Sequence, residues 1–154
     1  MRFAVILAVG IVLGTPLPAD AQQWTSEQQE VIDSLEMCWD MWVESVQEGS
    51  PDRWLDNCTE EGFAFWWIYS SPLGEDWMRG NWDTIMEADD KWLGLSPVWV
   101  RVYDDDFAIM HFWGYWQITE DEDRVTIEAK RTEVFHKVNG RWLLAAGHST
   151  PVSQ

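Results

Sequence analysis

The sequence predicts an α+β domain in which helices come first and a bent antiparallel sheet follows. Residues 25–48 repeat their apolar positions at helical spacing, whereas the segments after residue 98 alternate as strands do. Asn139-Gly140 separates two of these strand segments, and Asn-Gly favours a tight hairpin because both turn residues need a positive φ. Helices followed by a run of hairpin-connected strands are typical of the α+β class.

The first residues have the pattern of a secretory signal peptide. Arg2 gives a positive start, residues 3–13 are apolar, and Ala19-Asp20-Ala21 fits an A-x-A cleavage site. We therefore expect residues 1–21 to be removed and residues 22–154 to form one periplasmic or secreted domain. The alternative is an uncleaved N-terminal anchor.

The composition limits the partners of this domain. The formal net charge is -17, with 27 acidic and 10 basic residues. Nucleic acids and anionic membranes attract Lys and Arg, so neither is an expected partner once the signal is removed. The charge favours a soluble acidic protein.

The first helix has both a start signal and a stop signal. Thr25 with Gln28 matches a capping box, and Gly49 suits the end of a helix. Pro51 then suits the first turn of a short second helix that runs through Leu55. One apolar stripe recurs along the first helix at Val31, Leu35, Cys38, Trp42 and Val46.

Cys38 and Cys58 lie on either side of the turn at residues 49–51. A helical hairpin would bring them together, and export permits oxidation. We expect a disulfide between them; two buried thiols are the alternative.

The middle of the chain holds a buried strand and a third helix. Residues 62–69 are almost continuously apolar, and residues 70–74 interrupt them. A helix over residues 81–93 fits Trp82, Ile85, Met86 and Trp92. Strands are then predicted at residues 98–103, 107–118, 125–138 and 142–150, with Asp104-Asp105-Asp106 as a hairpin tip.

The two-residue turn at 139–140 sets the register of the last hairpin. Counting outward from it places Phe135 opposite Leu144, Glu133 opposite Ala146, and Arg131 opposite His148. Residues directly opposite one another share a face. Glu133, Arg131 and His148 are therefore predicted at one end of the apolar inner face.

The two faces of the predicted sheet differ in character. The inner face also carries Val98, Val100, Val102, Met110, Phe112, Gly114, Trp116, Val125, Ile127 and Ala129. The outer face carries Trp99, Tyr103, Phe107, Ile109, His111, Trp113 and Tyr115 beside Glu128, Lys130 and Thr132. Large exposed apolar patches mark interfaces, so we expect a homodimer through the outer face.

Three stretches carry a resemblance to a known family: residues 131–142, Gly147-His148-Ser149-Thr150, and Arg79-Gly80. Together they resemble the SnoaL-like branch of the nuclear-transport-factor-2-like superfamily, over roughly residues 26–152. The resemblance implies a cone-shaped fold in which helices close over a strongly curved sheet and leave a pocket. Members include isomerases, dehydratases and non-catalytic association domains, so the fold does not fix the activity.

A candidate catalytic site follows from the inner face. A carboxylate among apolar walls suits proton transfer, so Glu133 is the predicted base, His148 the acid or relay, and Arg131 the clamp for an anionic oxygen. The alternative is a buried polar network that only locks the hairpin. The expected pocket is lined by Trp42, Tyr69, Met110, Phe112, Trp116, Phe135 and Trp142.

The predicted function is accordingly binding of a small hydrophobic molecule, with isomerase- or dehydratase-type chemistry on a carbonyl compound. No metal site and no cofactor are expected. The alternative is a non-catalytic dimerisation or protein-interaction module whose cavity is filled by its own side chains. Thirteen tryptophans are enough to fill such a cone.

Overall fold

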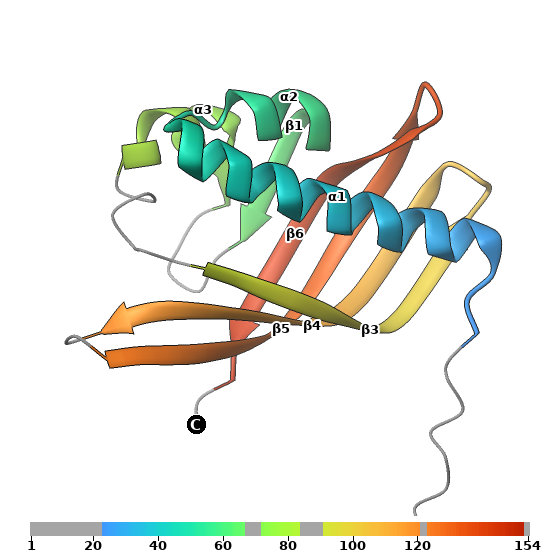
Figure 1. Ribbon diagram of the computed structural model, residues 1–154. Coiled ribbons are helices and arrows are strands. Elements are labelled where there is room, and N and C mark those ends of the chain that lie inside the picture. Colours follow the sequence, from blue (N-terminus) through green and yellow to red (C-terminus); the bar gives the residue numbers. More distant parts are fainter. Residues whose placement is uncertain (1–22, 67–71, 84–90, 121–122, 153–154) are drawn as a thin grey trace, which may run out of the picture.

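A computed structural model describes residues 23–66, 72–83, 91–120 and 123–152 (Figure 1). The helices are α1 (Ser26–Glu48), α2 (Asp52–Cys58) and α3 (Glu75–Gly80). The strands are β1 (Thr59–Trp66), β2 (Leu73–Gly74), β3 (Lys91–Tyr103), β4 (Phe107–Glu120), β5 (Asp123–Val138) and β6 (Arg141–Pro151). The predicted signal peptide lies outside the described residues, and export stays a prediction.

The strands form a six-stranded sheet in the order β2-β1-β6-β5-β4-β3. Neighbours are antiparallel except β1 and β6, which run parallel. Helix α1 crosses one face of this curved sheet, as Figure 1 shows. We call that face, with Met110 and Phe112, the inner face, and the face with His111 and Trp113 the outer face. The predicted α+β class with helices over a curved sheet is confirmed.

Helix α1 begins and ends where its sequence signals predicted. The Thr25 side chain accepts a hydrogen bond from the Gln28 backbone N–H at 3.3 Å, and the Gln28 side chain accepts one from the Thr25 N–H at 2.9 Å. Gly49 ends the helix at φ 73°, a left-handed conformation that glycine adopts without steric cost. Val31 and Leu35 of the predicted stripe are fully buried beneath the helix.

Tryptophans fill the space between the helices and β1. The ring of Trp42 lies edge-on to those of Trp54 and Trp82, with centroids 5.0 Å apart in each case. Trp54 in turn packs edge-on against Phe63 of β1 at 5.7 Å. Edge-to-face pairs of this kind add roughly 0.5–1.5 kcal/mol beyond the area they bury. Trp42, Trp54 and Trp82 therefore contribute much of the packing under α1.

The third helix and β3 differ from the prediction. The expected helix over residues 81–93 is wrong at its end, because Lys91–Leu93 belong to β3; residues 84–90 lie outside the described residues. Val98 was predicted on the inner face but is 49% exposed. The register between β3 and β4 shifts between Pro97 and Trp99, so the alternation of faces is interrupted at Val98.

The inner face predicted for β4 and β5 is confirmed by their register. Met110 lies opposite Glu133, Phe112 opposite Arg131, and Gly114 opposite Ala129. The Asp104-Asp105-Asp106 hairpin tip is confirmed as well, with Asp104 and Asp105 at positive φ. Within the described residues, none of the helices combines the length and apolar character that a bilayer crossing requires.

The predicted disulfide is present and joins α1 to the end of α2. Cys38 and Cys58 are bonded, with their Cα atoms 5.5 Å apart, and both side chains are buried. A bond across 20 residues of chain removes conformational freedom mainly from the unfolded state.

Reducing this bond with a phosphine is expected to lower the free energy of unfolding by about 3 kcal/mol, the value expected for a loop of this length. Urea titrations of the oxidised and reduced protein, followed by circular dichroism, measure the difference. The Cys38→Ala/Cys58→Ala variant is the control and should not respond to the phosphine. Equal midpoints for oxidised and reduced wild type would contradict the expectation.

Candidate functional site

A one-residue shift between β5 and β6 decides which side chains reach the polar centre of the inner face. Phe135 lies opposite Leu144, but Val134 lies opposite Ala146, so Ala145 is an extra residue in β6. Beyond this bulge, Glu133 faces Gly147 and Arg131 faces Ser149. A bulge of one residue transfers every later side chain to the opposite face.

The placement predicted for His148 is therefore wrong. His148 lies opposite Thr132, is exposed, and points to the outer face. Ser149, which the sequence reasoning did not select, takes its place beside Arg131 and is fully buried. Ser149 is part of the motif Gly147-His148-Ser149-Thr150, but nothing in the sequence marks the extra residue at Ala145.

Arg131 and Glu133 form a buried ion pair, as their shared face on β5 predicted. Arg131 Nη2 lies 2.8 Å from Glu133 Oε1, and the two side chains are 5% and 2% exposed. The guanidinium also lies near the rings of Trp39, Phe65 and Phe112, at 4.5, 5.0 and 5.6 Å from their centroids. Aromatic faces attract a cation electrostatically, so these rings stabilise the buried charge.

Burial opposes ionisation of both partners. Desolvation raises the pKa of Glu133, and the nearby Arg131 charge partly offsets this. Desolvation likewise lowers the pKa of Arg131 against the opposing effect of Glu133. The second carboxyl oxygen of Glu133 and the Ser149 hydroxyl are buried and have no hydrogen-bond partner within the described part of the chain. The site is a compact polar centre inside an apolar core.

Gly147 allows the aromatic wall to approach this pair. A Cβ atom at Gly147 would lie 2.6 Å from a ring carbon of Phe65 and 3.4 Å from Cγ of Glu133. Any larger residue would have to displace the Phe65 ring. Trp39, Phe65 and Gly147 thus belong to the site, although the sequence reasoning singled out none of them for it.

The expected pocket-lining residues divide into three groups. Buried side chains on the inner face are Met110, Phe112, Trp116, Phe135 and Trp142. Trp42 is half-buried and lies in the tryptophan cluster under α1. Tyr69 lies outside the described residues. Binding of a ligand against the buried inner-face side chains stays a prediction.

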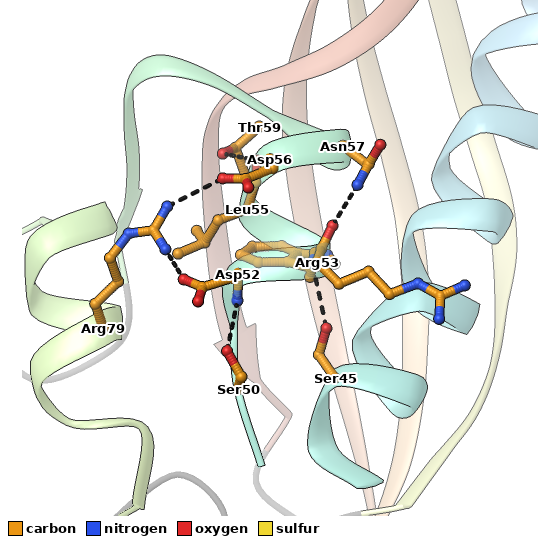
Figure 2. A network of polar contacts seen from close by, with 10 residues as sticks. Ser45, Ser50, Asp52, Arg53, Leu55, Asp56, Asn57, Thr59 and Arg79 are labelled. Carbon is orange, nitrogen blue, oxygen red and sulfur yellow. Dashed lines mark hydrogen bonds and ion pairs between the residues drawn. The ribbon is translucent and has the colours of Figure 1, made fainter. Parts of the chain in front are cut away.

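A separate polar cavity of about 290 Å³ lies where α1 turns into α2 and faces α3. Arg79 of α3 lines it and forms ion pairs with Asp52 and Asp56 of α2, as Figure 2 shows. These ion pairs join α3 to α2. Neither Arg131 nor Glu133 lines this cavity. Among the described residues, no group of His, Cys, Asp and Glu side chains is arranged to hold a metal ion.

Comparison with known proteins places this chain in a family. Residues 27–153 match the calcium/calmodulin dependent protein kinase II association domain. The chain belongs to this family. Its fold is nuclear-transport-factor-2-like, in agreement with the resemblance found in the sequence. No match was found among curated proteins.

Solved structures agree on the fold at low sequence identity. An association-domain protein from Xanthomonas campestris has a TM-score of 0.62 at 19% identity, covering 91% of this chain and 94% of its own. A CaMKII hub homology domain from Chlamydomonas reinhardtii has a TM-score of 0.60 at 16% identity, covering 84% and 100%. A ketosteroid isomerase-like protein from Erwinia carotovora has a TM-score of 0.64 at 11% identity, covering 85% and 100%.

Replacing Glu133 with Gln is expected to destabilise the fold by about 3 kcal/mol or more, because it leaves the buried Arg131 charge without its counter-charge. Urea unfolding of the variant measures the loss. Adding Arg131→Met should recover part of the stability, since the orphaned charge is then removed. If the losses in the free energy of unfolding caused by Glu133→Gln and by Arg131→Met simply added in the double variant, the two side chains would not be energetically coupled.

Proposed function

We propose that this chain is a non-catalytic association domain that forms a homodimer through the outer face of its sheet. The observation that carries the proposal is an aromatic face that no described helix covers, in a chain of the association-domain family. A monomer rarely leaves an apolar face of this kind in contact with water.

Aromatic side chains run along the outer face of β3 and β4. Trp99 and Phe107 are each 37% exposed. Between and beside them lie half-buried side chains: Tyr103, Ile109, Trp113 and Tyr115. Tryptophan, tyrosine and phenylalanine are enriched in the core of protein interfaces because they bury a large area with few rotatable bonds.

The distribution of acidic residues over the two sides of the sheet also supports pairing through the outer face. Arg101 lies over the ring of Tyr103 at 4.9 Å, and Lys130 over the ring of Trp113 at 5.5 Å. Helix α1, by contrast, contains no Lys or Arg. Its carboxylates are Glu27, Glu30, Asp33, Glu36, Asp40, Glu44 and Glu48. Outer faces in contact would keep these acidic helices of the two copies apart, which reduces repulsion between strongly negative chains.

The Ile109→Lys variant tests this interface. Ile109 lies at the centre of the face, opposite Arg101 and Val134. An added lysine would be buried beside Arg101, so we expect the dimer dissociation constant to rise about 100-fold or more, a cost of about 3 kcal/mol. Sedimentation equilibrium measures it.

Met37→Lys is the matched control, because Met37 is 42% exposed and lies on α1 on the opposite side of the sheet. It should leave the dissociation constant unchanged. If Met37→Lys weakened the dimer and Ile109→Lys did not, the interface would lie on the helices, and the proposal would be contradicted.

The second candidate is binding of a small molecule at the Arg131–Glu133 centre, with proton transfer by Glu133. It is supported by the buried Glu133 oxygen and Ser149 hydroxyl that have no hydrogen-bond partner within the described part of the chain, since such groups are normally satisfied. In this version Arg131 holds an anionic oxygen, and Ser149 takes the position expected for His148.

Native mass spectrometry tests the second candidate. A co-purified small molecule that is present in the wild-type protein and absent from Glu133→Gln would support binding at this centre. Ser149→Ala should also reduce its occupancy, while Met37→Lys should not. A wild-type protein with the mass of its chain alone, even after incubation with small carbonyl compounds, would count against this candidate.

A further inference from the structure

The outer face carries a row of side chains that crosses β3, β4, β5, β6 and β1. Trp99 lies opposite His111, His111 opposite Thr132, and Thr132 opposite His148. His148 is in turn paired with Trp66 of β1. Trp66 is 53% exposed. The bulge at Ala145 creates this row, because it brings His148 to the outer face.

All three histidines of the chain are exposed, and all lie on the outer face. His111 stacks on Trp99 with ring centroids 5.1 Å apart, and its Nδ1 lies 2.8 Å from the Thr132 hydroxyl. The Nε2 atom of His148 lies 3.5 Å from the Thr150 hydroxyl. His136 differs, because its Nδ1 lies 2.9 Å from a carboxyl oxygen of Glu60.

Within the described residues, the charged groups nearest to the row are basic. From β3, Arg101 lies one pair along from Trp99, and from β5, Lys130 lies one pair along from Thr132. Lys130 also lies opposite Thr150 of β6, which is two residues beyond His148 on the same face. The carboxylate of Glu128 lies two pairs from His111, opposite Tyr115. Protonation of His111 or His148 would therefore add positive charge where positive charge is already present.

We propose that His111 and His148 make association through the outer face sensitive to pH, with a dimer when both are neutral and separate copies when they are protonated. This inference rests on the proposed function. A two-fold interface contains each residue twice, so protonation buries like charges from both copies. Histidine is the side chain whose charge changes between about pH 5 and 8.

The expected effect is large. If each copy excludes the proton from one of these histidines in the dimer, the dissociation constant rises about 100-fold between pH 7.5 and pH 5.5. Exclusion from both histidines would give a still larger change. Association is therefore strong at a pH above the range in which histidine takes up a proton, and the dimer dissociates as the pH falls through that range.

Sedimentation equilibrium of the full chain at pH 7.5, 6.5 and 5.5 tests the proposal. The wild-type dissociation constant should rise about 100-fold or more across the range. The variant His111→Asn/His148→Asn should dimerise with a dissociation constant that is nearly independent of pH. His148→Asn alone, at an exposed position, should reduce the pH dependence to the part that His111 contributes. His136→Asn is the control and should keep it.

The outcomes separate this inference from the proposed function. A wild-type chain that is monomeric at pH 7.5 would overturn both. A wild-type dimer whose dissociation constant does not change with pH would overturn the pH response and leave the interface. A full pH response in His148→Asn and in the double variant would overturn the role of the histidine row.

Discussion

The register between β5 and β6 is the constraint on which both faces of this sheet depend. The turn at Asn139-Gly140 fixes the pairing near the hairpin end, and the extra residue at Ala145 shifts it by one beyond Phe135. Before the shift, Leu144 packs into the core. After it, Gly147 and Ser149 face inward and His148 faces outward. Without the bulge, an imidazole would occupy the place beside Arg131, and Ser149 would lie on the surface.

The inner face is organised around one buried charge pair. Arg131 is held by Glu133 and by three aromatic rings, and Gly147 leaves room for one of those rings, that of Phe65. A buried pair of this kind adds little net stability, but loss of either partner leaves an uncompensated charge. The pair therefore favours a single arrangement of β5 against β6 and α1. The same rigid sheet presents the aromatic outer face, so the inner packing and the proposed association depend on the same strands.

Much of the fold could be predicted from the sequence because local signals agreed with the tertiary structure. The capping box at Thr25, the Asn139-Gly140 turn and the alternation along β4 each act over a few residues, and each gave the correct element or register. The disulfide followed from the turn between the two helices. Arg131 and Glu133 were correctly placed on the inner face because they are close to the turn in sequence and share one strand.

The errors arise where one residue interrupts an alternation. The extra residue at Ala145 has no glycine or proline beside it, and Pro97 beside Val98 does not by itself mark a bulge, so counting from a turn failed beyond both positions. Counting from the turn predicts His148 on the inner face, and it therefore leaves Ser149 on the outer face. Trp39 could not be assigned to the site because it reaches Arg131 from another element, through packing of α1 on the sheet. The start of β3 at Lys91 was missed because Trp92 also fits a helical pattern.

Side-chain footprinting with a photochemically generated carbene tests the central claim of association through the outer face most directly. The full chain would be labelled at concentrations above and below its dissociation constant. We expect Trp99 and Phe107 to become protected at the higher concentration, while Met37 on α1 is labelled equally at both. Protection of Met37 with unchanged labelling of Trp99 and Phe107 would contradict this claim.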